Sequence, residues 1–132
     1  MQRLKTRAQF QAALAGGSKA KTVHFALHSC PLNDAGALHE PPAESLFPLD
    51  DVWLGAMVPK RWARRAVTRN CIKRQVHRVS TELAIGLAHG AHVVRLRAGF
   101  DRARFPSAAS QALKATVRAE LLQLFERARV AQ

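Results

Sequence analysis

Residues 55–78 read GAMVPKRWARRAVTRNCIKRQVHR, a short apolar run that stops at Pro59 and a long basic run that follows it. Proline cannot donate a hydrogen bond to a strand ladder, so Pro59 predicts the end of a strand over residues 52–58. Beyond it, apolar residues recur at i, i+4, i+7 and i+11, the spacing of one helical face. This spacing predicts a helix over residues 65–87, ended by Gly90, with a buried stripe formed by Ile72, Val76, Val79 and Leu83.

The exposed side of this predicted helix carries charge of a single sign. Between the acidic residues 51 and 82 the chain has eight Lys or Arg and no carboxylate. Solvated helix faces usually mix the two signs, because like charges repel along a helix. An unmixed face predicts a polyanionic partner that relieves the repulsion, and the plain alternative is a solvated surface. Two adjacent rows form the face, one of Arg69, Lys73 and His77 and one of Asn70, Arg74 and Arg78.

The overall charge also indicates a polyanionic partner. The chain of 132 residues has 21 Lys or Arg and 9 Asp or Glu, a formal net charge of +12. The planar guanidinium groups of the arginines can bind phosphates and stack on bases, and the Asn70 side chain can donate and accept hydrogen bonds. This combination suits folded RNA better than a regular duplex. A membrane partner is disfavoured, because no run reaches the roughly 18 to 20 apolar residues of a spanning helix and the start lacks the apolar middle of a signal peptide. We therefore expect a single cytoplasmic RNA-binding domain over residues 1–132.

The N-terminal part predicts a helix, a strand and a connector. Thr6 and Gln9 have the spacing of a capping box, and Gly16–Gly17 marks the end of the helix. Residues 31–50 are rich in proline and acidic residues and contain no Lys or Arg, so we expect a solvated connector there. Residues 22–30 alternate as in a strand, with Val23, Phe25 and Leu27 on one face and His24, Ala26 and His28 on the other.

The C-terminal part predicts a strand over residues 92–98 and a final helix. Ser107 follows Pro106 and is expected to cap that helix. Cys30 and Cys71 form neither a CxxC pair nor a disulfide framework, so both are expected to be reduced and structural. The apolar face of the final helix is formed by Leu113, Val117, Leu121 and Leu124.

Other classes of function compete with RNA binding. A self-sufficient nuclease needs grouped carboxylates for two metal ions, and Asp50, Asp51 and Glu82 are the one conceivable group. A basic module without a processing role, bound to ribosomes or DNA, stays open on composition alone. A zinc site is disfavoured for two reasons. His24 and His28 lie too far apart along an extended strand to form a compact pair, and His89 and His92 lack thiol or carboxylate ligands nearby.

The basic stretch resembles the signature region of the bacterial ribonuclease P protein component. That region is a strand ending in a Lys pair, followed by an Arg-rich helix, and RLKTRAQFQAAL near the start resembles the opening of the same family. Two departures stand out: Cys71 replaces the usual second Arg of the motif, which is expected to remove one RNA contact, and the 31–50 connector is longer than is typical. The positions that match in order are Lys60, Arg61, Arg64, Arg65, Ala66, Arg69, Asn70, Ile72, Lys73, Arg74 and Arg78.

The resemblance implies an α/β fold, an α+β sandwich shared with one domain of a small-subunit ribosomal protein. It has a mixed, roughly four-stranded sheet packed by about three helices in the order αβββαβα, with a left-handed β-α-β crossover around the basic helix. It also implies the function of a ribonuclease P subunit. Family members assist a catalytic RNA subunit, which holds Mg²⁺, in removing the 5′ leader of precursor tRNA; no catalytic residue and no metal site are expected in the protein.

Two groups of binding residues follow from the resemblance. A cleft between the sheet and the first helix takes the single-stranded leader, and Phe10, Phe25 and His28 are expected to line it because aromatic faces stack on bases. Replacing Arg69 and Lys73 with Ala is expected to weaken RNA binding without lowering the melting temperature. The expected RNA-binding residues are Lys60, Arg61, Arg64, Arg65, Arg69, Asn70, Lys73, Arg74 and Arg78.

Overall fold

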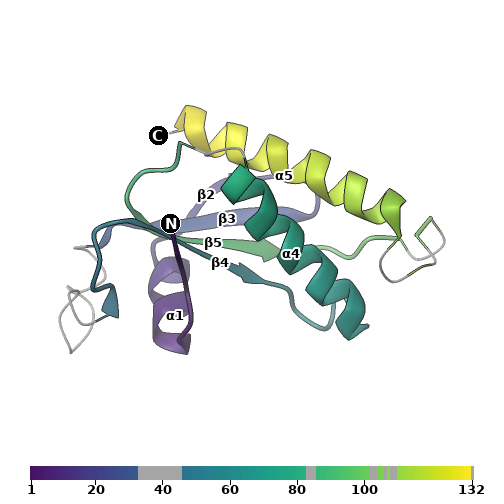
Figure 1. The fold of residues 1–132 in the computed structure, drawn as a ribbon, viewed down its shortest axis with the longest axis horizontal. Coiled ribbons are helices and arrows are strands. Elements are labelled where there is room, and N and C mark those ends of the chain that lie inside the picture. The colour runs from purple at the N-terminus through teal and green to yellow at the C-terminus, as the bar shows by residue number, and fades with distance from the viewer. Residues whose placement is uncertain (33–45, 83–85, 102–103, 106, 108–109, 132) are drawn as a thin grey trace.

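The computed structural model describes residues 1–32, 46–82, 86–101, 104–105, 107 and 110–131 (Figure 1). From the first helix onward its elements follow the αβββαβα order that the resemblance implies, and a two-residue strand precedes them. In chain order the elements are β1 (Gln2–Arg3), α1 (Arg7–Ala15), β2 (Ser18–Lys21), β3 (Phe25–Cys30), β4 (Val52–Met57), α4 (Ala66–Glu82), β5 (Gly90–Leu96) and α5 (Gln111–Ala131).

The strands form one mixed sheet of five strands in the order β1-β4-β5-β3-β2. β4 is parallel to both of its neighbours, whereas β3 is antiparallel to β5 and to β2. The sheet has one strand more than expected, because Gln2 pairs with Trp53 and Arg3 pairs with Leu54 at the free edge of β4. α4 joins the adjacent parallel strands β4 and β5, so the β-α-β crossover is present. The left-handed sense of this crossover stays a prediction.

Helices cover both faces of the sheet, with α1 on one face and α4 and α5 on the other (Figure 1). Successive strand residues point to opposite faces, so each strand contributes to two cores. The larger core, under α4 and α5, contains the predicted stripe residues Ile72, Val76 and Val79, all fully buried; Leu83 lies outside the described residues. The predicted apolar face of α5 is confirmed in the same core, through Leu113, Val117, Leu121 and Leu124. The smaller core, under α1, includes Ala13, Cys30, Trp53 and Val93.

The start of α1 confirms the predicted capping box. Thr6 Oγ1 accepts a hydrogen bond from the Gln9 backbone N–H at 3.2 Å, and Gln9 Oε1 accepts one from the Thr6 backbone N–H at 3.1 Å. After the helix, Gly17 has a φ of 91°, a value that glycine adopts without strain. These two signals are local, and they fix both ends of α1.

The prediction of one strand over residues 22–30 was wrong at its beginning. Residues 22–25 form the turn between β2 and β3, where the Thr22 N–H donates to the Phe25 carbonyl oxygen at 2.8 Å. Val23 is therefore 71% exposed instead of packing beside Phe25. The separate strand β2 was not predicted from the residues.

Two further boundaries differ from the predictions. α5 begins at Gln111 and its cap is Ser110, whose Oγ accepts from the Leu113 N–H at 3.1 Å, so Ser107 is not the cap. Gly90 is the first residue of β5 rather than the end of the preceding helix. Residues 33–45 of the connector lie outside the described residues, but Phe47 is buried and packs edge-on against Trp53, with ring centroids 5.5 Å apart.

Cys30 and Cys71 are reduced, as predicted, and both are buried. Of the helices in the described part of the chain, none combines the length and the apolar character needed to cross a bilayer.

Candidate nucleic-acid interface

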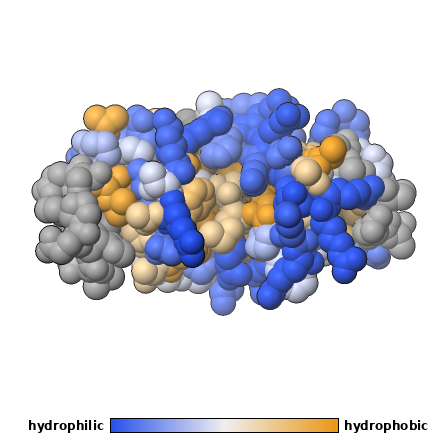
Figure 2. All heavy atoms as spheres, turned by 90° about the horizontal axis from the view of Figure 1, so that it is seen from below, coloured by the Kyte–Doolittle hydropathy of each residue, from blue (hydrophilic) through white to orange (hydrophobic). Residues whose placement is uncertain are grey.

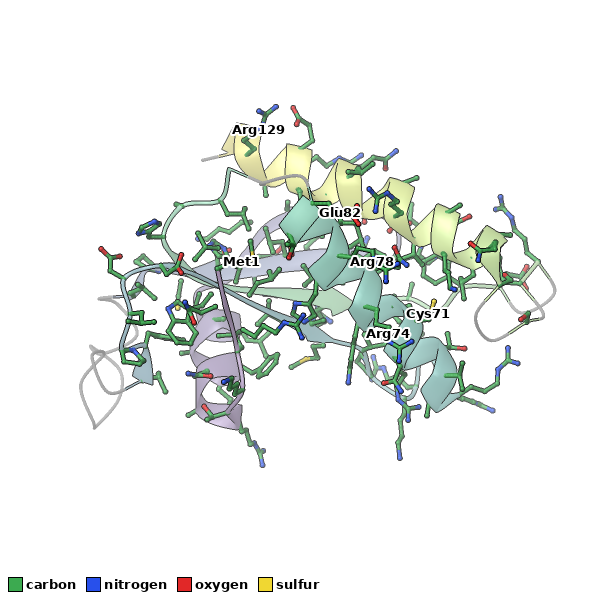
Figure 3. All side chains as sticks on the ribbon, in the orientation of Figure 1. Met1, Cys71, Arg74, Arg78, Glu82 and Arg129 are labelled. Atoms are coloured by element: carbon green, nitrogen blue, oxygen red, sulfur yellow. The ribbon has the colours of Figure 1, made fainter. Side chains whose placement is uncertain are left out.

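A groove of about 770 Å³ runs along the exposed side of α4. Figure 3 shows Arg74, Arg78 and Glu82 in succession along this helix. Arg3 of β1 lies on the groove's other side, because the pairing of β1 with β4 brings the N-terminus beside a helix some 70 residues away. The lining residues are Arg3, Asn70, Lys73, Arg74, His77, Arg78, Thr81 and Glu82.

The positive charge of this groove is not neutralised by the groove's own acidic residue. Glu82 accepts a hydrogen bond from Arg118 of α5 at 2.8 Å, so its carboxylate is engaged with another helix. Among the ion pairs formed by the described residues, none includes Lys73, Arg74 or Arg78. The groove therefore holds several exposed cations whose repulsion is relieved only by solvent or by a bound anion.

His77 contributes little charge to the groove at neutral pH. Burial lowers the pKa of its imidazole, and the positive charge of Arg3 lowers it further. The cations of the groove are therefore arginines and a lysine, and His77 adds a neutral ring able to donate and accept hydrogen bonds.

Arg69 has a role that the sequence did not indicate. Its Nη1 group donates to the carbonyl oxygens of Ala63 at 3.0 Å and Arg64 at 2.7 Å, and the side chain is only half-exposed. Arg69 thus ties the segment before α4 to the first turn of the helix. The prediction that its loss leaves stability unchanged does not fit this geometry.

The other predicted basic residues lie at the entrance to α4 or along it. Lys60, Arg61 and Arg64 are exposed on the segment between β4 and α4, and Arg65 is half-buried there. The Arg61 guanidinium lies over the ring of Trp62, 4.8 Å from its centroid. The structure therefore divides the predicted residues between the helix entrance and the groove, and Asn70 lies in the groove.

Cys71 is not among the residues that line the groove. It is 5% exposed and lines a small pocket with Lys114 of α5. Burial raises the pKa of its thiol, against the opposing effect of the Lys114 and Arg74 charges. The residue that departs from the family motif therefore contributes packing near α5 rather than an exposed polar group.

The sheet face that carries α1 presents the second predicted site. Phe10 is half-buried directly over Gly55, where an added Cβ would lie 2.7 Å from the Phe10 ring. His28 lies on the same face and its Nε2 accepts from Arg95 Nε at 3.2 Å. Burial lowers the pKa of His28, and the charges of Arg95 and Lys21 lower it further. In Figure 2, which views the molecule from the side of α1, strongly hydrophilic residues surround a paler, more hydrophobic band.

The prediction that Phe25 lines this cleft was wrong. Phe25 is 1% exposed and belongs to the larger core under α4 and α5, on the opposite face of the sheet from Phe10. Residues 25 and 28 are separated by an odd number of positions, so a regular strand points them to opposite faces. That parity was readable from the sequence.

Arg3 and Arg95 are the residues that sequence reasoning missed. Arg3 sits in a strand of two residues, too short to give a periodic signal. Arg95 belongs to a strand that was predicted, and its alternation with Val94 and Leu96 was a usable sign that it faces α1.

The carboxylates considered for a nuclease have separate partners. The Asp51 carboxylate accepts a hydrogen bond from the backbone N–H of the next residue, Val52, at 2.7 Å and pairs with the N-terminal amine at 3.2 Å. Asp50 contacts His89 at 3.1 Å. Glu82 is bound to Arg118. Within the described residues, no three His, Cys, Asp or Glu side chains are grouped as metal ligands.

A mixed sheet with helices on both faces and an uncompensated basic groove defines a small cationic α/β protein. The sequence profile of the family described as Ribonuclease P matches residues 1–128. The chain belongs to this family.

Individual relatives agree with the profile. The "Ribonuclease P protein component" of Burkholderia pseudomallei (strain 1106a) is 38% identical over 78 residues, which cover 59% of this chain and 57% of that relative. The chain thus spans a little over half the length of this relative. The protein of the same description from Bordetella parapertussis is 32% identical over 125 residues, covering 95% of this chain and 89% of the relative.

A solved structure has the same fold. The Staphylococcus aureus RNase P protein superposes with a TM-score of 0.67, covering 100% of this chain and 99% of the other, at 21% identity. The expected α/β class, with a mixed sheet and three helices, is therefore confirmed, and the sheet has five strands.

Proposed function

We propose that this chain acts in the cytoplasm as the protein component of ribonuclease P. In this role it binds a catalytic RNA subunit and the 5′ leader of precursor tRNA and assists removal of the leader. Family membership supports the proposal, and so do the two binding surfaces described above.

One observation carries the proposal: the groove along α4 gathers Arg3, Lys73, Arg74 and Arg78 while its carboxylate, Glu82, is bound to Arg118. An RNA backbone entering the groove replaces the counterions of its phosphates with these side chains. Binding then gains free energy from counterion release and from relief of the repulsion within the groove. Arg74 and Arg78 can each donate two parallel hydrogen bonds to a phosphate.

The α1 face is proposed to hold the leader. Phe10 offers part of an aromatic ring, and the Arg95 guanidinium lies on the same face, held by His28 at 3.2 Å. Stacking on such a ring depends little on base identity, which suits leaders of different sequence. His28 stays a proposed residue of this site, whereas Phe25 is buried on the opposite face of the sheet and does not belong to it.

Mg²⁺ is proposed to be held mainly by the RNA subunit. Mg²⁺ prefers carboxylate and phosphate oxygens, and the groove offers cations together with one carboxylate that is already bound to Arg118. These residues do not fit a magnesium site of the protein's own. No chemical step is therefore assigned to a metal ion on this chain.

The first test measures RNA affinity against salt concentration. Each phosphate contact adds roughly 0.7 to 0.9 to the slope of log K against log salt. Lys73→Ala with Arg78→Ala is expected to weaken binding to a bacterial ribonuclease P RNA and to lower that slope by about 1.4 to 1.8. The matched control, Lys19→Ala with Lys21→Ala, removes two exposed charges from β2, at the opposite edge of the sheet from β1. Equal losses in both double variants would show that net charge alone, and not the groove, sets the affinity.

The second test separates processing from binding alone. The protein is mixed with a bacterial ribonuclease P RNA at low magnesium, and cleavage of precursor tRNA is followed. Restored cleavage supports the proposal, whereas tight binding without restored cleavage would favour a basic RNA-binding module. Cleavage by the protein without RNA would instead identify a nuclease.

A further inference from the structure

A separate pocket of about 210 Å³ lies at the N-terminal end of α4, outside the groove, and three of the residues predicted to bind RNA line it: Arg61, Arg64 and Arg65. It lies between the segment before α4 and the segment before α5. Its base is apolar, with Ile72 and Leu113 buried in the larger core. Phe105 lines it but is 8% exposed, with the Arg104 guanidinium over its ring, whereas Phe100 is only partly buried and stacks on His24. The groove, in contrast, begins at Asn70 and follows the exposed side of the helix.

The edge of this pocket is strongly cationic. Arg61, Arg64 and Arg65 line it, and no carboxylate does so among the described residues. Thr68 and Ser107 add hydroxyl groups. Two of these residues, Arg61 and Arg64, are exposed, and an apolar pocket bordered by exposed guanidinium groups attracts anions.

Hydrogen bonds to backbone carbonyl oxygens restrain residues on both sides of the pocket. On one side, Arg69 Nη1 donates to the carbonyl oxygens of Ala63 and Arg64, and the Ala63 N–H donates to the Pro59 carbonyl oxygen at 3.2 Å. On the other side, the Phe105 N–H donates to the Asp101 carbonyl oxygen at 2.8 Å. These hydrogen bonds restrain Ala63, Arg64 and Phe105 without a ligand, which lowers the entropy cost of binding.

We propose that this pocket receives one unstacked nucleotide of a bound RNA, with the base against Phe100 and the phosphate beside Arg61 and Arg64. The inference rests on the proposed function, since it assigns a third contact to the same RNA-binding protein. A free phosphate would contact the arginines but make no contact with an aromatic ring. An uncharged apolar ligand would remove water from the arginines without offering them a hydrogen-bond acceptor in its place. A flat base joined to a phosphate matches both parts of the pocket.

The test uses the full-length chain and small probes. Backbone amide NMR spectra are recorded during titration with adenosine 5′-monophosphate, ribose 5-phosphate and inorganic phosphate. The nucleotide is expected to shift the amide signals of Trp62, Phe105 and Ser107 more than that of Asn70. Ribose 5-phosphate and phosphate are expected to shift the pocket signals much less, because they lack the base. Equal shifts with all three probes, or no pocket shift at millimolar nucleotide, would overturn the inference.

Two variants connect those shifts to the pocket. Ser107→Phe places a ring at the pocket, while the matched Ser18→Phe adds the same ring on exposed β2. Phe100→Leu keeps an apolar side chain beside the core but removes the aromatic surface. We expect Ser107→Phe and Phe100→Leu each to weaken nucleotide binding roughly tenfold and Ser18→Phe to leave it unchanged. Wild-type nucleotide affinity in a folded Phe100→Leu variant would refute the stacking role.

The same measurements distinguish this inference from the proposed function. Lys73→Ala with Arg78→Ala removes groove charges and is expected to weaken RNA binding while the nucleotide still shifts the pocket signals. If RNA binding is unaffected by that double variant, the proposed groove fails even when the nucleotide binds. If groove variants behave as expected and Ser107→Phe changes neither nucleotide nor RNA binding, the pocket inference alone fails.

Discussion

The Arg69 guanidinium donates to the backbone carbonyl oxygen of Arg64 across 2.7 Å, and the same Nη1 group reaches the Ala63 carbonyl at 3.0 Å. A residue of the basic helix thus fixes the segment that leads into it. Part of the positive charge near α4 serves the fold and is only partly available to an RNA partner.

Arg69→Ala is therefore expected to lower stability as well as RNA affinity. The carbonyl oxygens of Ala63 and Arg64 lose a charged donor, which costs about 1 to 3 kcal/mol of unfolding free energy. Urea unfolding at neutral pH measures the change. The control is Lys73→Ala, whose side chain is exposed and is expected to leave the unfolding midpoint within experimental error. Equal midpoints for Arg69→Ala and the wild type would show that these hydrogen bonds contribute nothing to stability.

A second prediction concerns Glu120 of α5, which holds the turn between β2 and β3. One of its oxygens accepts from Thr22 Oγ1 at 2.6 Å and from the His24 backbone N–H at 2.7 Å; the other lies 2.7 Å from His24 Nδ1. Burial raises the pKa of this carboxyl, but the hydrogen bonds from Thr22 and His24 outweigh it and leave the pKa below the usual 4.5.

Glu120→Gln is expected to cost about 1 to 3 kcal/mol of unfolding free energy at neutral pH. Because the pKa is lowered in the folded state, the stabilisation is complete above pH 4.5 and is lost as the pH falls through the folded pKa. The difference between the two proteins should therefore shrink in acid, as measured by urea unfolding at several pH values. Glu126→Gln, at an exposed pair with Arg129, is the control and should have little effect. A difference that stays constant down to strongly acidic pH would contradict the prediction.

A third prediction concerns the pair formed by His28 and Arg95. Burial is the main cause of the lowered pKa of His28, and the Arg95 charge is the next. Arg95→Ala should raise the pKa of His28 toward 6.5, because it removes a nearby positive charge. The imidazole signals in NMR spectra report this titration directly.

His92 supplies an internal control for that titration. Burial lowers its pKa as well, but a hydrogen bond from the ring to the Ala88 carbonyl opposes the shift, and Arg95 is not among the causes. The pKa of His92 should therefore stay the same in Arg95→Ala.

Since the His28 pKa is lowered on folding, the stability that it contributes is complete above pH 6.5 and falls as the pH drops below it. A His28 titration unchanged by Arg95→Ala would exclude the electrostatic contact.

A fourth prediction tests the packing of Phe10 over Gly55 of the sheet. In Gly55→Ala the new Cβ would lie 2.7 Å from Phe10 Cε1 and 3.0 Å from Leu4 Cβ, closer than ordinary contact. The Phe10 ring must move, and overpacking of this kind costs about 1 to 3 kcal/mol. Unfolding measurements give the stability change, and binding of a short single-stranded RNA tests the proposed leader site.

Gly86→Ala is the matched control for that substitution. Its added Cβ would meet only Arg129 Cδ, at 3.7 Å, which is ordinary contact. We expect this variant to keep both stability and RNA affinity within a small margin. If Gly55→Ala binds the short RNA as well as the control does, the position of Phe10 does not matter for leader binding.

The sequence by itself determined the features that depend on neighbouring residues. Thr6 and Gln9 fixed the start of α1 because a capping box needs only one helical turn. The spacing of Ile72, Val76 and Val79 determined which side of α4 is buried, and with it which side carries the uncompensated cations. The fold class and the family were also within reach, since the signature stretch is continuous in the chain.

Only the tertiary structure decided which distant residues share a surface. Arg3 enters the groove of α4 through the pairing of β1 with β4, and Arg95 reaches His28 because β3 and β5 are neighbours in the sheet. Arg69 binds the carbonyls of a segment whose path is set by the packing of α4. The physical reason is that local periodicity determines which face of an element is apolar, whereas strand order and register, set by burial over the whole chain, determine what lies opposite that face.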